Sequence, residues 1–289
     1  SIQIPGPGAI NWVAKVADRI VTAKNSGIMH RWDGFSLVDL ATNLGPTSAQ
    51  SVGSVEDFRL YLNRVGAFGF GGGKPEIISN VIERQIYNDS GSAIAGGTFD
   101  SAPGAVYKYD WYAAVGTITD DLTNETLSNA VLCYDFQLNE WRNYSLSDNP
   151  TAWLNYKDAS GNEQLVFGDA GGQCYTLGGT ALSDNGKPIT SVIEYVINGG
   201  SPNLDKKWNY EWFFFNPGCQ AVVQVAYANT FATRSLNWVN LGQAVDGVVE
   251  FKHSDARSRL MFVKITESSM SARFQFFGHS SDFEVIERR

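Results

Sequence analysis

The 289-residue chain carries 22 Lys and Arg against 30 Asp and Glu, a formal net charge of −8. This acidic balance argues against a protein that binds nucleic acid or an anionic membrane. Aromatic residues make up 13% of the chain, charged residues only 18%, and 29 glycines are spread throughout it. Such a composition favours an all-β protein over a helical one.

The first predicted group of strands lies between residues 9 and 45. Two short apolar strands, Ile28–Trp32 and Phe35–Leu40, flank Asp33-Gly34, a strong signal for a tight hairpin turn. A second group spans residues 52 to 90 and contains the glycine-rich run Gly69–Pro75. A phosphate loop would need Ser or Thr after the lysine and then a helix, so we interpret this run as a turn.

The third group, residues 105 to 148, repeats the features of the first. An apolar strand ends on Tyr134-Asp135, as the earlier one ends on Trp32-Asp33, and a further aromatic residue, Trp141, follows. The fourth group, residues 150 to 198, contains the stretch Gln164–Gly178, QLVFGDAGGQCYTLG. Two apolar runs joined by a glycine-rich linker predict a β-hairpin, and weaker versions of it recur along the chain.

The fifth and sixth groups cover residues 206 to 242 and 247 to 289. The fifth opens with the aromatic run Trp208–Phe215, and the sixth shows four short strand patterns. The six groups start roughly 40 to 55 residues apart, a spacing typical of four-stranded propeller blades. We therefore expect one β-propeller domain over residues 1–289 with about six blades. The alternative is two β-sandwich domains that meet near residue 150.

A propeller must also close its ring. The sixth group already shows four strands, whereas the first shows about three. We expect that either the C-terminal strand Phe283–Glu287 or the N-terminal Ile2–Ile4 completes a shared sheet at the seam.

Few residues suggest catalysis. A Ser-His-Asp site needs one histidine beside an acid and a nucleophile. We place His30 in a predicted strand, His253 just after one and His279 in a predicted turn, and we interpret all three as structural. A glycoside hydrolase would need two carboxylates across a central funnel. The acids that interrupt apolar runs are the candidates for such a pair, but exposed positions on outer strands are the simpler explanation for them: Glu194, Glu211 and Glu250.

Binding sites are also weakly indicated. Trp208, Trp212 and Trp238 could stack on a sugar, but core packing is the simpler explanation. The acidic loop 120–125 lacks the glycine and spacing of an EF-hand, and we interpret it as solvated. We predict no catalytic residue, no metal ligand and no cofactor.

Three widely spaced cysteines, Cys133, Cys174 and Cys219, fit neither a zinc site nor a disulfide framework. Each lies in an apolar run, so we expect buried free thiols and a reducing compartment. Neither a signal-peptide pattern nor an apolar stretch of membrane-spanning length is found. We therefore expect no membrane insertion.

Several late segments resemble propeller-type structural proteins of tailed bacteriophages. They are the strand Val131–Asp135 with Trp141, the hairpin QLVFGDAGGQCYTL, the segment DKKWNY from Asp205, and Ser258-Arg259 with Ala272–Phe274. The resemblance covers about residues 130 to 289, while the first 130 residues agree only in their general strand pattern. None of these motifs is catalytic.

The resemblance implies a non-enzymatic virion component made in the bacterial host cytoplasm. It would form a homo-oligomeric ring at the tail, nozzle or head–tail connector, bind other tail or connector proteins, and let DNA pass without specific binding. The alternative function is a glycan-active β-propeller, either a glycoside hydrolase or a lectin.

Overall fold

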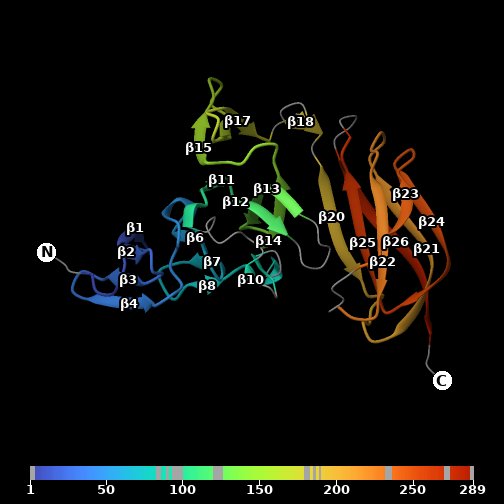
Figure 1. Ribbon diagram of the computed structural model, residues 1–289, viewed down its shortest axis with the longest axis horizontal. Coiled ribbons are helices and arrows are strands. Elements are labelled where there is room, and N and C mark those ends of the chain that lie inside the picture. The colour runs from blue at the N-terminus through green and yellow to red at the C-terminus, as the bar shows by residue number, and fades with distance from the viewer. Residues whose placement is uncertain are drawn as a thin grey trace. The chain divides into compact units, whose positions relative to one another are not determined.

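The computed structural model describes residues 4–82, 86–88, 91–92, 100–119, 126–178, 183–184, 187–188, 190–231, 236–269 and 274–286. It divides into two compact units (Figure 1). The N-terminal unit comprises Ser1–Asp121 with Glu125–Gly179, and the C-terminal unit comprises Leu122–Asn124 with Thr180–Arg289. The expected all-β class, with propeller-like four-stranded antiparallel sheets, is confirmed.

The described part of the N-terminal unit contains four antiparallel sheets of three or four strands, in each of which every strand pairs with the next strand along the chain. Sheet 1 contains β1 (Ile10–Val16), β2 (Arg19–Lys24), β3 (Met29–Trp32) and β4 (Leu37–Ala41). Sheet 2 contains β5 (Gly53–Val55), β6 (Phe58–Asn63), β7 (Gly66–Phe70) and β8 (Glu76–Ile77). Sheet 3 contains β11 (Gly104–Tyr107), β12 (Asp110–Thr119), β13 (Thr126–Asp135) and β14 (Glu140–Ser145). Sheet 4 contains β15 (Ala152–Lys157), β16 (Glu163–Gly168) and β17 (Cys174–Leu177).

Sheets 1 to 3 agree with the first three groups of strands expected from the sequence, and sheet 4 agrees with the first part of the fourth group. The last strand expected in the fourth group belongs to the C-terminal unit instead, where Ser191–Ile197 pairs with Leu260–Glu267. The predicted hairpin Gln164–Gly178 is the β16–β17 pair, with Phe167 opposite Tyr175. Its turn is closed by the Asp169 carboxylate, which accepts the backbone N–H of Gln173. Gly172 has a φ of +81°, the left-handed conformation that glycine adopts without strain.

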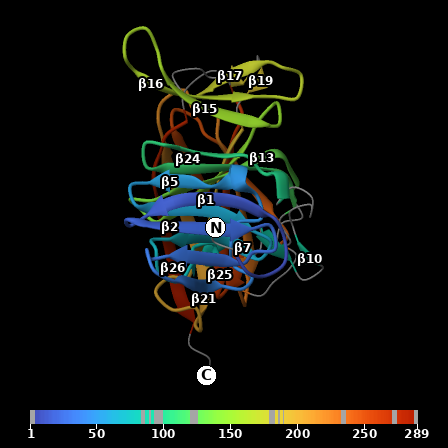
Figure 2. The ribbon, with the colours of Figure 1, turned by 90° about the vertical axis from the view of Figure 1, so that its left-hand side faces the viewer.

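The four sheets pack one on the next through apolar faces. Sheets 1 and 2 enclose a cluster that includes Val21, Met29, Tyr61 and Phe70. Sheets 2 and 3 enclose a larger cluster, and sheets 3 and 4 a third one. The middle sheets are covered on both faces, and for this reason β12 is a nearly continuous apolar run rather than an alternating one. Figure 2 shows the N-terminal unit from its sheet 1 side, with β15–β17 at the top.

Indole N–H groups form hydrogen bonds between neighbouring sheets. In each case the indole of one sheet donates to a backbone carbonyl just before the first strand of the preceding sheet. The fully buried Trp111 of sheet 3 donates its Nε1–H to the carbonyl of Ser51, 3.0 Å away, just before β5. Trp153 of sheet 4 donates in the same way to the carbonyl of Pro103, 3.2 Å away, just before β11. These bonds satisfy backbone carbonyls that lie between sheets.

The C-terminal unit is a two-sheet β-sandwich. Sheet 5 has the strand order β20 (Ser191–Ile197), β25 (Leu260–Glu267), β22 (Val222–Ala228), β23 (Val239–Gln243). Sheet 6 has the strand order β24 (Val248–Ser258), β21 (Asp205–Phe215), β26 (Phe276–Ile286). An apolar core with contributions from both sheets includes Trp208, Phe213, Val225 and Val263.

The last two expected blades, 206–242 and 247–289, differ from this arrangement. Strands of the fifth group pair with strands of the sixth: β21 with β24 and β26, and β22 with β25. The chain therefore forms two units instead of the single domain 1–289, and the second of them matches the sandwich alternative, with the division near residue 179 rather than 150. Short-range strand patterns identified the strands but not their partners, because alternation alone does not specify pairing.

The expected closure of a ring also differs. The C-terminal strand is part of β26, which pairs with β21 inside the sandwich. A single strand, Phe276–Ile286, replaces two of the short patterns expected in the sixth group. Ile2 and Gln3, the other closure candidate, lie outside the described residues.

Four two-stranded or single-turn elements complete the fold. The short strands pair as β9 (Tyr87–Asn88) with β10 (Gly91–Ser92) and β18 (Ser183–Asp184) with β19 (Lys187–Pro188). The two 3₁₀ turns are η1 (Ala49–Ser51) and η2 (Asn80–Ile82). None of the helical segments within the described residues has the length and apolar character to cross a membrane.

The cysteines are all free, but only two are buried. Cys133 and Cys219 fit the expectation of buried thiols, whereas Cys174 is exposed at the start of β17. Its side chain alternates with that of Tyr175 and therefore lies on the face of sheet 4 turned away from sheet 3.

Candidate functional site

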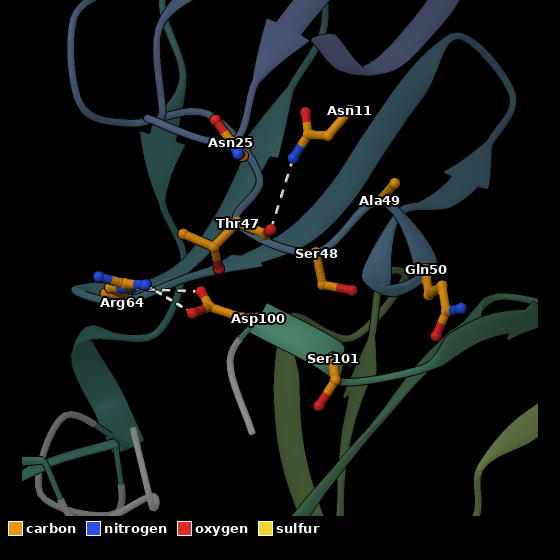
Figure 3. A pocket seen from close by; sticks show the side chains of 9 residues that line it. All are labelled: Asn11, Asn25, Thr47, Ser48, Ala49, Gln50, Arg64, Asp100 and Ser101. Atoms are coloured by element: carbon orange, nitrogen blue, oxygen red, sulfur yellow. Dashed lines mark hydrogen bonds and ion pairs between the residues drawn. The ribbon is translucent and has the colours of Figure 1, made fainter. Parts of the chain in front are cut away.

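A polar pocket of about 520 Å³ lies in the N-terminal unit (Figure 3). Segments from three sheets form it: β1, the turns after β2 and β6, and the approaches to β5 and β11. Its lining residues are Asn11, Asn25, Thr47, Ser48, Ala49, Gln50, Arg64, Asp100 and Ser101.

Hydrogen bonds hold the walls of this pocket. Asn11 donates its Nδ2–H groups to the carbonyls of Pro46 and Thr47, at 3.0 and 3.4 Å, and so joins β1 to the approach to β5. The Oδ1 atom of Asn11 is buried and has no hydrogen-bond partner among the described residues. Ser48 donates its hydroxyl to the carbonyl of Ala102, 3.1 Å away, and fixes the approach to β11.

One ion pair lies in the pocket. The Arg64 guanidinium contacts the Asp100 carboxylate through two nitrogens, with Nη2–Oδ2 and Nε–Oδ1 distances of 2.5 and 3.3 Å. The hydrogen bond to Asp100 raises the pKa of Arg64. Both side chains are largely exposed, so the pair contributes little to stability, but its bidentate geometry orients both groups.

The pocket can offer hydrogen bonds to a polar ligand, from amides, hydroxyls and one guanidinium. It holds one carboxylate, and that group already pairs with arginine. General acid–base hydrolysis of a glycoside needs two carboxyl groups, so the described lining of this pocket lacks one. The sequence did not predict the pocket, because its residues are ordinary polar residues contributed by separate turns.

A buried polar cluster in the C-terminal unit brings together residues that lie far apart in the sequence. Glu211 has no exposed surface. Its Oε2 lies 2.7 Å from Nε2 of His279, and its Oε1 accepts the Ser281 hydroxyl at 2.8 Å. Oε1 also lies 3.4 Å from Nε2 of His253.

The opposite sheet completes this cluster. The hydroxyl of Tyr227, on β22, lies 2.6 Å from Nδ1 of His253. Burial alone would raise the pKa of Glu211, but hydrogen bonds from His279 and Ser281, together with the nearby His253 imidazole, outweigh it and hold the pKa below its ordinary value. Burial and the charge of Glu211 raise the pKa of the Tyr195 hydroxyl. The cluster stabilises a carboxylate in the core, where a substrate has no access to Glu211.

The other two candidate acids do not join Glu211 in a catalytic arrangement. Glu194, on β20, lies 3.6 Å from Lys264 of the neighbouring strand. Glu250 is exposed on β24 opposite Trp212. All three acids belong to the sandwich, so none lies at the axis of a propeller.

His30 has a structural environment. It is buried on β3, with Nδ1 2.7 Å from the Asp39 carboxylate and Nε2 3.2 Å from the carbonyl of Pro5. The run Gly69–Pro75 spans the end of β7 and the turn to β8, as predicted. The loop 120–125 lies outside the described residues. Among the described residues, no group of three or more His, Cys, Asp or Glu is arranged to hold a metal ion.

The three tryptophans proposed for sugar stacking occupy different environments. Trp208 is fully buried and donates to Ser258 Oγ, 2.8 Å away, and Trp238 packs beside Phe262. Trp212 is half-buried on the outer face of sheet 6, nearly parallel to the ring of Tyr210, with 5.6 Å between centroids. Phe214 continues this row on the same face and is 40% exposed.

Comparison with known proteins adds no family. No protein-family model matches the chain, and no curated protein matches it.

Some solved structures show distant similarity. The computationally designed Ika4 protein is 16% identical with a TM-score of 0.36, over 60% of this chain and 92% of its own. A family 43 arabinoxylan arabinofuranohydrolase from Bacillus subtilis is 9% identical with a TM-score of 0.25, over 96% and 78%. An exo-β-1,3-galactanase from Phanerochaete chrysosporium is 9% identical with a TM-score of 0.23, over 92% and 77%. At these TM-scores the similarities assign no function.

Proposed function

We propose that the protein is a non-enzymatic structural component of a tailed-phage virion, which builds a ring at the tail, nozzle or head–tail connector. One observation carries the proposal: the row of sheets in the N-terminal unit ends in apolar side chains that remain in solvent. Leu154 of sheet 4 is 61% exposed and Val13 of sheet 1 is 59% exposed, although both belong to sheets whose other face is packed. Exposed apolar faces of this kind favour protein–protein contact.

The ionisable groups support a structural role. The candidate acids of the sandwich are buried, paired or isolated, and the pocket of the N-terminal unit contains one carboxylate. The net charge of −8 suits a wall past which DNA moves without being held. On this proposal the partners are other tail or connector proteins, and the protein is made in the host cytoplasm before it enters the virion.

Purified particles provide the test. Mass spectrometry of the phage that encodes this chain should find it at a fixed number of copies, and antibodies should label one level of the tail or connector in negative-stain images. Particles assembled without the protein should lack that ring. Intact, infectious particles that contain none of the chain would reject the proposal.

The row of aromatic rings on sheet 6 favours a second candidate, glycan binding. Tyr210, Trp212 and Phe214 alternate along β21 on its outer face. Exposed polar residues flank them on both neighbouring strands: Glu250, Lys252, Ser280 and Asp282. Aromatic faces beside hydrogen-bonding groups suit a sugar, which has both apolar and hydroxyl surfaces.

A glycan array separates the two candidates. Binding to a defined glycan that is lost in Trp212→Ala, but retained in a control variant Phe35→Ala, would support this second function. Phe35 is an apt control because it is 95% exposed in the N-terminal unit. An array without binding would reject the second function, and the structural proposal would stand on the particle experiment alone.

A further inference from the structure

The packing of the N-terminal unit follows one rule from sheet to sheet. Each sheet has a forward face toward the next sheet in the chain and a rear face toward the previous one. On β11, for example, Val106 contributes to the cluster with sheet 2, and Tyr107 to the cluster with sheet 4. Sheets 2 and 3 use both faces in this way.

Among the described residues of the N-terminal unit, no sheet follows the forward face of sheet 4. Trp153 points back to sheet 3, so its neighbours Leu154 and Tyr156 point forward along β15 together with Val166 opposite Leu154. Leu154 is 61% exposed and Tyr156 42%. In sheets 1 to 3, the next sheet buries the forward face. The forward side chains of sheet 4 therefore lie on a face that is packed in the other sheets but is not covered by a sheet here.

The rear face of sheet 1 likewise has no preceding sheet packed on it among the described residues. Ala14 and Val21 pack toward sheet 2, so Val13, Ile20 and Trp32 lie on the opposite face. Val13 is 59% exposed and Ile20 49%.

The N-terminal segment covers one end of this rear face. The Lys24 ammonium donates to the carbonyls of Ile4 and Gly6, and the carbonyl of Pro5 lies 3.2 Å from Nε2 of His30. Val13 and Ile20 stay outside this cover.

We propose that the occupant of each free face is a second copy of this chain, with the forward face of sheet 4 packed on the rear face of sheet 1 of the next copy. This inference rests on the assembling role proposed above and specifies its contact. Continuity favours this occupant, because three contacts of forward face on rear face already exist within the unit, and the two free faces are one of each kind. Such a contact is head-to-tail, and it closes into a ring or extends as a filament.

Tyr156 supports this continuation. In sheet 3, Tyr107 lies at the end of the first strand and donates its hydroxyl to the carbonyl of Glu163, 2.7 Å away, where β16 of the next sheet begins. Tyr156 lies near the end of the first strand of sheet 4, on the same forward side. In the assembly its hydroxyl would reach the carbonyl of Arg19 of the second copy, where β2 begins.

The test blocks one face at a time in the full chain. Leu154→Glu places a charge on the forward face and Val13→Glu places one on the rear face. A charge without a partner is strongly unfavourable in a packed contact. Leu138→Glu is the control, since Leu138 is 65% exposed in the turn between β13 and β14, away from both faces. Sedimentation velocity should show the wild type and the control associated and each blocked variant monomeric, and circular dichroism should confirm that all are folded.

Mixing the two blocked variants gives the decisive result. Leu154→Glu retains a free rear face and Val13→Glu a free forward face, so an isotope-labelled mixture should form a one-to-one dimer by native mass spectrometry. Tyr156→Phe should weaken association without abolishing it.

Several outcomes would overturn the inference: a wild type that stays monomeric, a mixture that stays monomeric, or a control that behaves like the blocked variants. Such results concern this contact alone. Absence of the chain from particles would instead reject the structural role itself.

Discussion

Glu211 and His279 lie on neighbouring strands of sheet 6, with 2.7 Å between Oε2 and Nε2, and the carboxylate has no exposed surface. Its folded-state pKa is held below the ordinary value of 4.5, so the ionised form stabilises the fold. That stability is present above the unfolded-state pKa and is lost as pH falls through the folded-state pKa. We expect acidification below about pH 4.5 to destabilise the C-terminal unit.

Substitution tests the same carboxylate. Glu211→Gln keeps the shape but removes the charge, and should lower the free energy of unfolding by about 1 to 3 kcal/mol at pH 7. The difference from wild type should shrink in acid, as measured by urea titration at several pH values. Glu250→Gln, at an exposed position of β24, should change stability by less than about 0.5 kcal/mol. A constant difference across pH would contradict the assigned role of the charge.

Trp111 is expected to stabilise the contact between sheets 2 and 3 through its indole N–H. Trp111→Phe leaves the Ser51 carbonyl without its donor at a buried position, which should cost about 1 to 3 kcal/mol. Hydrogen exchange should show the loss of protection in the N-terminal unit. Trp141→Phe removes a similar bond to the carbonyl of Ile78 at a partly buried position, and should cost less.

Gly34 has a φ of +100°, a conformation that strains any residue with a Cβ. Gly34→Val should therefore destabilise the protein by about 1 to 3 kcal/mol, more than Ser36→Val does. Thermal unfolding of both variants provides the measurement, and equal midpoints would contradict the expectation. The turn differs by one residue from the sequence prediction: Gly34 and Phe35 are central, and Asp33 accepts the backbone N–H groups of Phe35 and Ser36.

Cys174 should be the cysteine that reacts in the native protein, since Cys133 and Cys219 are buried. Burial raises the pKa of Cys133 to about 12 and that of Cys219 to about 11, so both remain thiols at neutral pH. A maleimide reagent should modify one site before denaturation and three afterwards. The fast site should disappear in Cys174→Ser, and its persistence would show that a second thiol is accessible.

The sequence predicted the N-terminal unit well because its pairing is local. Each strand of sheets 1 to 4 pairs with its neighbour in the chain, so alternation and turn residues such as Asp169–Gly172 are sufficient. In the C-terminal unit the strands were also visible, but β20 pairs with β25. Nothing in the alternation of Ser191–Ile197 indicates that distant partner.

The candidate sites were less predictable for the same reason. Glu211 stands out in the sequence because it interrupts an apolar run, and His253 and His279 because the chain has only three histidines. Their association depends on the register of three strands: Ser281 lies opposite Glu211, and His279 opposite Phe213. The pocket beside Arg64 and Asp100 combines turns of separate sheets, and the exposed position of Cys174 follows from the missing neighbour of sheet 4.

The contrast between neighbour-by-neighbour pairing in sheets 1 to 4 and the distant pairing of β20 with β25 has a consequence for biosynthesis. Sheets 1 to 4 can form one after another during translation, since each needs only strands that are close together in the sequence and have already been synthesised. The segment Ser191–Ile197 must wait until residues 261 to 267 have emerged. The sandwich therefore assembles late, on a chain whose first half is already folded.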